Sequence, residues 1–163
     1  MTQLQIRAAS REDRAALTTL AVSSGLFETD DIGALDGMLG EYFDDKLPEH
    51  VWVVATVARA IAGAAYHAPE MMTDGTRNLY FIAVDPGSQG GGIDRALLEH
   101  VEQALERAHQ RLLVIETAGL EGFERTRKFY RTRGYVEEAR IRYAAGDDEV
   151  FSKLLGVGRT AES

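Results

Sequence analysis

The chain of 163 residues contains no cysteine. Disulfides, thiolate metal sites, iron–sulfur clusters and thiol nucleophiles are therefore excluded together. Long apolar runs are also missing, because the longest, at 51–58, is far shorter than the about 20 residues of a membrane-spanning helix. The opening MTQLQIRAASRED has no signal-peptide hydrophobic region. We therefore expect a cytoplasmic protein without membrane contacts.

Positive charge is scarce, with 18 Lys and Arg against 26 Asp and Glu. The resulting net charge of −8 opposes binding to nucleic acid over the whole surface, although a local basic patch can hold one small anion. The histidines do not form a metal site, because His100 and His109 fall on opposite faces of one predicted helix while His50 and His67 flank different strands. Without a Gly-x-Ser-x-Gly sequence, a serine hydrolase elbow is excluded as well.

The periodicity of apolar residues predicts an α/β protein with the element order β-α-α-β-β-β-α-β-α-β-β, which indicates a mixed sheet flanked by helices. β-rich runs predict strands at 4–7, 51–57, 61–66, 79–84, 112–116, 135–143 and 150–155. Helical spacing predicts helices after Ser10 and at 30–45, 93–108 and 126–133. We assign 1–155 to a single domain and 156–163 to a frayed tail.

A glycine-rich loop at 87–92 joins a predicted strand to a predicted helix. Its backbone N–H groups, together with the helix dipole, suit a phosphate or pyrophosphate. The Walker pattern is absent, and the dinucleotide fingerprint fails because Arg95 stands where its third glycine belongs. Glu116 lies at the spacing of the acidic residue in that fingerprint, so a nucleotide-dependent oxidoreductase is one alternative. A loop that needs glycine only to turn is another.

The segment 84–98 closely resembles the acyl-CoA-binding motif of the GCN5-related N-acetyltransferase (GNAT) family, Gln/Arg-x-x-Gly-x-Gly/Ala. Gln89 and Gly92 match the pattern, whereas Asp94 stands where the family has glycine or alanine. The opening 6–13, the strand pair at 51–66 and the late segment 128–135 also resemble the family. The resemblance implies a GNAT-like, mostly antiparallel central sheet flanked by helices. It also implies transfer of an acetyl group from acetyl-CoA to a primary amine of a small molecule or peptide, by direct attack in a ternary complex.

The resemblance implies that the pyrophosphate lies on the loop amides and that the pantetheine pairs with 82–84, where the strands at 79–84 and 112–116 splay apart. The cofactor-binding residues implied are Ile82, Val84, Gln89, Gly90, Gly91, Gly92, Ile93, Asp94 and Tyr130. The Val84 N–H is the candidate donor to the oxyanion, because a strand amide is already in place before the reaction. We expect the Asp94 carboxylate to point outward, so that it does not compete for the loop amides.

An amine with a pKa near about 10.4 is mostly protonated at pH 7, so a base must take its proton. Glu116, at the end of a buried-looking strand, is the predicted general base, acting directly or through a water, and burial there would favour its neutral form. The alternative is a structural carboxylate. Tyr130 matches the family tyrosine that protonates the leaving thiolate, and its alternative is a core aromatic residue.

Charge is uneven along the chain, with acidic residues crowded at 28–45 and basic residues at 125–142. One region favours cations and the other favours CoA phosphates, unless both are solvated helix faces. In the GNAT family the segment joining the first two helices shapes the acceptor site, so Leu26, Phe27 and Tyr42 are predicted to line it, with His67 as a further candidate. The alternative function is a non-catalytic acyl-CoA-binding sensor or interaction module. Strand edges near the C-terminus favour a homodimer.

Overall fold

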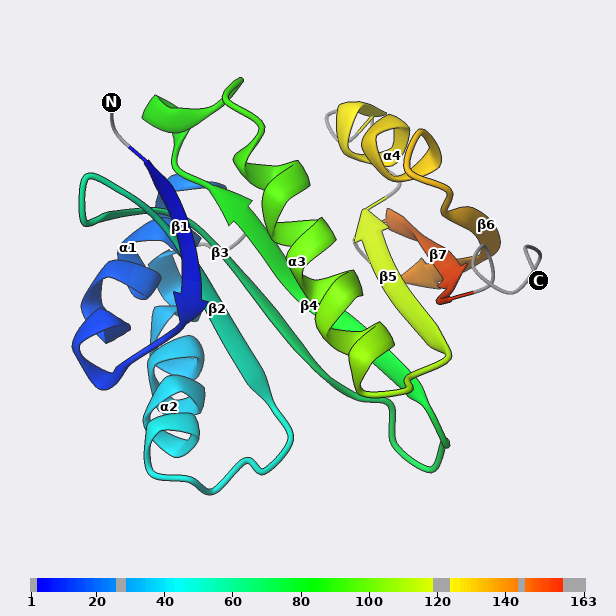
Figure 1. Ribbon diagram of the computed structural model, residues 1–163, viewed down its shortest axis with the longest axis horizontal. Coiled ribbons are helices and arrows are strands. Elements are labelled where there is room, and N and C mark those ends of the chain that lie inside the picture. Colours follow the sequence, from blue (N-terminus) through cyan, green and yellow to red (C-terminus); the bar gives the residue numbers. More distant parts are fainter. Residues whose placement is uncertain (1–2, 26–28, 119–123, 144–145, 157–163) are drawn as a thin grey trace. The chain divides into compact units, whose positions relative to one another are not determined.

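The computed structural model describes residues 3–25, 29–118, 124–143 and 146–156 (Figure 1). Its helices and strands follow the predicted order, which confirms the α/β class. They are β1 (Leu4–Ala8), α1 (Arg14–Ser23), α2 (Ile32–Phe43), β2 (Val51–Val57), β3 (Ala60–Pro69), β4 (Thr76–Val84), α3 (Ile93–Arg107), β5 (Leu112–Ala118), α4 (Glu124–Arg131), β6 (Val136–Tyr143) and β7 (Gly146–Leu154).

The strands form one seven-stranded sheet in the order β1-β2-β3-β4-β5-β7-β6. β4 and β5 are parallel, whereas β1–β2, β2–β3, β5–β7 and β6–β7 are antiparallel, so the expected mostly antiparallel sheet is confirmed. The chain divides into two compact units. Unit 1 comprises Met1–Ala68 and Phe81–Val101, and unit 2 comprises Pro69–Tyr80 and Glu102–Ser163. The assignment of 1–155 to a single domain stays a prediction.

The core of unit 1 lies between the helices α1 and α2 and one face of the strands. Trp52 is central to it, with its ring stacked on Tyr66 at 4.6 Å and tilted against Phe81 at 5.4 Å between centroids. Leu17 from α1 and Leu39 from α2 are both fully buried in the same cluster. Successive residues of a strand face opposite sides of the sheet, so the residues of β4 that alternate with those in this cluster lie on the other face.

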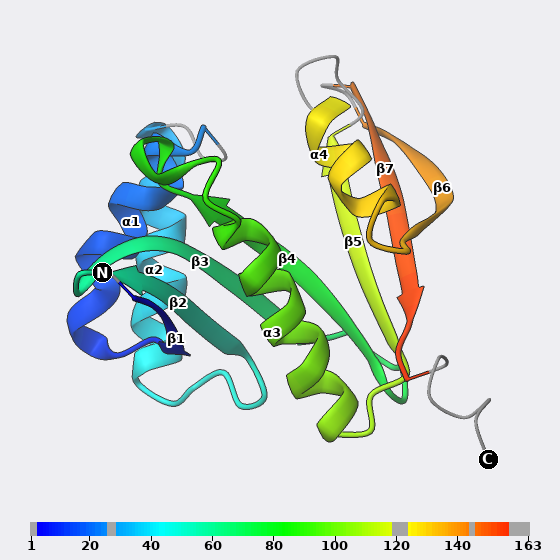
Figure 2. The ribbon, with the colours of Figure 1, turned by 45° about the horizontal axis from the view of Figure 1, so that its top comes forward.

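The helix α3 packs on the other face of the unit 1 strands, as Figure 2 shows for its part within that unit. Gly63 on β3 makes this possible, because a Cβ atom there would lie only 3.0 Å from Ile93 and 3.1 Å from Leu97. Neighbouring Ala64 belongs to the core against α1 and α2. Close packing of α3 on β3 therefore depends on the missing side chain at position 63.

The connection from β1 to α1 is held by one carboxylate. Asp13 accepts hydrogen bonds from Arg7 at 2.7 and 3.0 Å, and from the backbone N–H of Ser10 at 2.7 Å. The Arg7 guanidinium lowers the pKa of Asp13 below its ordinary value, with the Ser10 N–H adding to the effect. The helix predicted after Ser10 thus begins with a 3-10 turn, Arg11–Asp13, before α1 proper.

In unit 2 one face of β5 and β7 carries buried Leu113, Ile115 and Phe151. The helix α4 covers this face through Tyr130, whose ring lies 6.0 Å from that of Phe151. The last part of α3 is joined to β7 by an ion pair between Glu102 and Lys153, with 2.9 Å between the charged atoms.

The strand β7 begins at Gly146, four residues before the predicted start at position 150. Residues 146–149 read Gly-Asp-Asp-Glu, which has no apolar alternation. Pairing with β6 explains the extension, because Arg140 lies opposite Glu149 and bonds to it at 3.0 Å. Cross-strand charge pairs of this kind stabilise a hairpin but leave no apolar pattern in the sequence.

Candidate functional site

The predicted phosphate loop follows β4 in unit 1, after a 3-10 turn at Pro86–Ser88. Asp85 holds the turn in place through one hydrogen bond of its backbone and one of its side chain. Its backbone N–H donates to Ala62 at 2.7 Å, and its carboxylate accepts from the backbone N–H of Gly87 at 3.1 Å. These bonds hold the start of the loop against β3, while residues 89–92 are exposed.

Two glycines of the loop adopt the left-handed backbone conformation that other residues avoid. The φ angle is +86° at Gly90 and +77° at Gly92. No described atom lies within 4 Å of a Cβ built at either position, so backbone conformation, not crowding, favours glycine there. A loop with such turns next to a helix N-terminus can direct several N–H groups at an anion.

The first turn of α3 completes this group of amides. The bond from Ala96 N–H to Gly92 at 3.0 Å leaves the N–H groups of Ile93, Asp94 and Arg95 ahead of the helical ladder. The Asp94 carboxylate is exposed and turned toward Arg95, whose backbone N–H donates to its Oδ1 at 2.7 Å, and its expected outward orientation stays a prediction. The Arg95 guanidinium bonds instead to Glu99 at 2.9 Å, so it does not draw the carboxylate away.

On β4, the candidate residues Ile82 and Val84 are half-buried. They alternate with Phe81 and Ala83, which belong to the unit 1 core, and therefore face the other side of the strand. The parallel pairing of β4 with β5 runs from Thr76 opposite Leu112 to Leu79 opposite Ile115. Ile82 and Val84 thus belong to the part of β4 that follows this pairing.

Glu116 lies on β5 opposite Val150 of β7, in unit 2. Its side chain is exposed, so the burial expected at this position is wrong. The reason is strand alternation, since Ile115 takes the buried face and Glu116 the other. Glu116 is accessible to water and can exchange protons with solvent.

Tyr130, also in unit 2, is only 2% exposed. Its ring makes edge contacts with Phe129 at 5.4 Å and Tyr135 at 5.6 Å, and a tilted contact with Phe151. Burial, helped by the nearby Glu102 carboxylate, raises the pKa of the neighbouring Tyr135. The ring of Tyr130 is thus buried in an aromatic cluster with Phe129, Tyr135 and Phe151.

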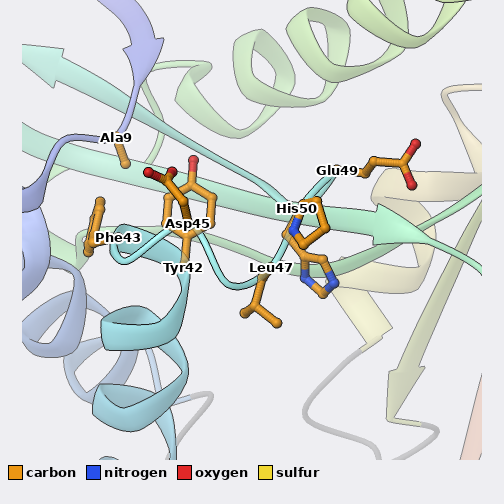
Figure 3. Close-up of a pocket in the computed structure, with 8 residues that line it drawn as sticks. Ala9, Tyr42, Phe43, Asp45, Leu47, Glu49 and His50 are labelled. Atoms are coloured by element: carbon orange, nitrogen blue, oxygen red, sulfur yellow. The ribbon is translucent and has the colours of Figure 1, made fainter.

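A pocket of about 430 Å³ opens in unit 1 where α2 ends and β2 begins (Figure 3). The residues that line it are Ala9, Tyr42, Phe43, Asp45, Leu47, Pro48, Glu49 and His50. Glu49 points away from the other labelled side chains in Figure 3. Asp44, beside the pocket, is paired with Arg11 at 3.1 Å, whereas Asp45 has no ion-pair partner among the described residues. The pocket therefore combines aromatic walls with one uncompensated carboxylate, which suits a cation.

Of the predicted acceptor residues, Tyr42 lines this pocket and His67 does not. His67 is buried on β3, 4% exposed, opposite Val51. Leu26 and Phe27 lie outside the described residues. His50 is half-buried, lines the pocket and hydrogen-bonds through Nδ1 to the Tyr66 hydroxyl. No sequence pattern predicts that bond, because it joins the residue before β2 to a residue within β3, 16 positions away.

Several charges from the acidic and basic regions are already paired. Arg14 holds Asp36 through two hydrogen bonds of 2.8 and 2.9 Å and lowers the pKa of that carboxyl group. In unit 2, Arg131 and Arg140 bond to the buried Glu149. These side chains are less available for a ligand than their clustering in the sequence suggests.

The candidate residues divide between the units, with Val84, the loop and the Tyr42 pocket in unit 1 and Glu116 and Tyr130 in unit 2. Within the described parts of the chain, no three His, Asp or Glu side chains gather as a metal ion would require. None of the described helices combines the length and apolar character needed to cross a membrane.

Solved structures share this architecture. A GNAT-family protein from Desulfovibrio desulfuricans is 27% identical, with a TM-score of 0.87 over 93% of this chain and 99% of that chain. The ribosomal-protein-S18-alanine N-acetyltransferase of Escherichia coli is 19% identical, with a TM-score of 0.77 over 94% of each chain. PaiA N-acetyltransferase from Thermoplasma acidophilum, solved with coenzyme A, is 16% identical, with a TM-score of 0.75 over 93% of this chain and 99% of that one.

A comparison with curated protein sequences finds no match. The family model for the acetyltransferase (GNAT) domain, however, matches residues 48–137, which is more than half of the chain. The match spans the strands β2 to β5, the glycine loop, the helix α3 and Tyr130. It agrees with the family that the motif at 84–98 resembles. The chain belongs to the GNAT family of acetyltransferases.

Proposed function

We propose that this acetyltransferase moves an acetyl group from acetyl-CoA to a primary amine of a small molecule or peptide, by direct attack in a ternary complex. The observation that carries the proposal is the exposed loop at 89–92, with two left-handed glycines leading into α3. The coenzyme A in the PaiA structure supports the donor class. We place the reaction in the cytoplasm, where acetyl-CoA is available.

In this proposal the loop and the first turn of α3 bind the donor. The backbone N–H groups of 89–94 would hold the pyrophosphate, aided by the positive end of the helix dipole. The pantetheine amides would pair with Ile82–Val84, on the part of β4 that follows its pairing with β5. The Val84 N–H would then donate to the oxygen of the thioester carbonyl as negative charge develops there.

The chemistry needs one proton acceptor and one proton donor. The amine nitrogen attacks the thioester carbon, the C–N bond forms, and the C–S bond breaks. Glu116 takes the proton of the attacking nitrogen directly or through a water, and its exposure lets that proton leave to solvent. Tyr130 gives a proton or a hydrogen bond to the CoA thiolate, and no covalent acyl-enzyme forms.

We expect the acceptor amine to be protonated, and so positively charged, when it binds. The pocket lined by Tyr42 and Asp45 is our proposed place for its charged end, because an aromatic wall beside a carboxylate favours ammonium groups. We retain Leu26 and Phe27 as proposed acceptor residues. We assign His67 a core role, because it is buried and does not line that pocket.

The homodimer stays a prediction. β6 is an edge strand of the sheet, but it carries Glu137, Glu138, Arg140 and Arg142, and its pairing with β7 is irregular between Glu137 and Ala139. Charges and bulges on an edge strand oppose pairing with another sheet. If a dimer forms, we therefore expect it to use a surface other than this edge.

Release of free thiol from acetyl-CoA tests the proposal, with polyamines, aminoglycosides, amino acids and peptide N-termini as acceptors. The chain has no cysteine, so all thiol detected comes from CoA. We expect one acceptor class to accelerate release far above the rate of hydrolysis, with one acetylated amine formed per thiol. Acetyl-CoA binding without turnover for any amine would contradict the proposal and support an acyl-CoA sensor.

A further inference from the structure

A buried carboxylate in unit 2 connects three arginines. Glu149 of β7 is 4% exposed, and its oxygens accept from Arg140 at 3.0 Å and from Arg131 at 3.4 Å. The Nε atom of Arg127 lies 3.6 Å from the same carboxylate, and Arg127 is itself only 7% exposed. A charge pair that is this well buried has a high desolvation cost, so it need not stabilise the fold on balance.

The two arginines from α4 lie on either side of Tyr130 in the sequence. Residues 127, 130 and 131 fall on one face of a helix, because positions three and four apart are neighbours. Phe151, two residues beyond Glu149, contacts the Tyr130 ring at 6.0 Å and also lies 5.5 Å from the Arg131 guanidinium. β7 therefore holds α4 in two ways, by charge at Glu149 and by ring packing at Phe151.

We propose that Glu149 is a positioning residue for Tyr130, and this inference rests on the proposed role of Tyr130 as proton donor. Ring packing alone lets a helix slide or rotate slightly, because aromatic contacts tolerate a range of geometries. A carboxylate that bonds to arginines from both α4 and β6 has defined directions for its hydrogen bonds. The Glu149 contacts thereby set where α4 sits on β7 and where the phenol oxygen points.

The chain offers a matched control for this carboxylate. Glu137 also bonds to Arg131, at 3.1 Å, but its side chain is 35% exposed and no buried arginine depends on it in the described contacts. Glu137→Gln and Glu149→Gln remove the same charge from the same arginine. Only the second removes the buried contact that orients α4.

Steady-state kinetics of Glu149→Gln test the proposal together with the ¹⁹F NMR signal of fluorotyrosine at Tyr130, assigned by its loss in Tyr130→Phe. We expect Glu149→Gln to lower kcat about tenfold or more, with KM for acetyl-CoA within about twofold, and to shift the Tyr130 resonance. Glu149→Asp should restore part of the lost kcat and move the Tyr130 resonance part of the way back to its wild-type position. Glu137→Gln should leave both kcat and the Tyr130 resonance unchanged.

A Glu149→Gln protein that folds with an unshifted resonance, or one with a shifted resonance and an unchanged kcat, overturns the proposal. If Glu149→Gln does not fold, Arg131→Gln and Arg140→Gln replace it, because both side chains bond to Glu149 but only Arg131 lies on α4. Equal effects of these two variants on kcat and on the resonance overturn it as well. A wild-type protein without transferase activity contradicts the proposed function, and the Tyr130 resonance still reports whether Glu149 orients the ring.

Discussion

The Oδ1 atom of Asp94 accepts a hydrogen bond of 2.7 Å from the backbone N–H of Arg95, one of the first-turn amides of α3. This amide directly follows the N–H groups of 89–94 that we assign to the CoA pyrophosphate, so the carboxylate places a negative charge beside that proposed site. In the empty protein this bond stabilises the helix N-terminus. Binding of acetyl-CoA therefore brings its phosphates close to this charge, which repels them.

We therefore expect Asp94→Ala to bind acetyl-CoA more tightly than the wild type, by about fivefold for a change of about 1 kcal/mol. Asp94→Asn, which keeps an acceptor oxygen but loses the charge, should fall between the two. Calorimetric titration measures all three. Glu106→Ala is the control, because it removes an equal charge near the end of α3 and leaves both the Arg95 N–H bond and the Arg95–Glu99 pair intact. Equal or weaker binding by Asp94→Ala would contradict the repulsion.

Tyr130→Phe should retain the affinity for acetyl-CoA and lower kcat about a hundredfold, because it removes a proton donor and leaves the ring contacts with Tyr135 and Phe151. Steady-state kinetics and calorimetry separate the two effects. Tyr135→Phe removes a neighbouring buried hydroxyl from the same cluster and should leave kcat within about twofold. An unchanged kcat in Tyr130→Phe would reject Tyr130 as the acid and favour its core role.

Glu116→Gln should lower kcat and alter the rise of activity with pH. A general base works only when deprotonated, so activity rises as the pH passes through its pKa, and the amide cannot contribute such a rise. The pH profile of kcat/KM is the measurement, with Glu138→Gln on β6 as a carboxylate control. An identical profile in Glu116→Gln would transfer the role of base to a chain of waters or to another residue.

Asp45→Asn should raise KM for a cationic acceptor more at low salt than at high salt, because an exposed charge acts over about one Debye length. Asp44→Asn is the matched control next to it, since Asp44 is already paired with Arg11. The KM for the amine is measured at two salt concentrations for each variant. If Asp45→Asn and the wild type have the same KM at both salt concentrations, the pocket has no role in binding the acceptor.

Asp13→Asn keeps an acceptor for the Ser10 N–H but loses the charged pair with Arg7, so it should lower the melting temperature at neutral pH, at a cost of about 1 kcal/mol. The pKa of Asp13 is lowered in the folded protein, so its stabilisation is fully present above the unfolded value near 3.8 and is lost as the pH falls through the lower folded value. The difference in melting temperature between variant and wild type should therefore shrink below about pH 4. Glu12→Gln serves as the control. A constant difference down to pH 2 would show that ionised Asp13 is not its source.

Local patterns were sufficient to predict the order of elements, the glycine loop and the GNAT resemblance. Alternation and helical spacing depend on residues close in sequence, and a phosphate loop is continuous, so these features can be read without knowing the fold. The early start of β7 was missed because residues 146–149 have no apolar alternation, and the arginines that Glu149 bonds to lie on other elements, α4 and β6.

The amino-acid sequence by itself determined which segments form strands and helices, where the backbone turns at Gly90 and Gly92, and which family the chain resembles. Only the tertiary structure decided that Glu116 is exposed, that His50 hydrogen-bonds to Tyr66, and that Glu149 forms ion pairs with arginines of α4 and β6. The reason is physical. Propensity and periodicity act between neighbours in the chain, whereas burial and ion pairing depend on which distant segments fold together.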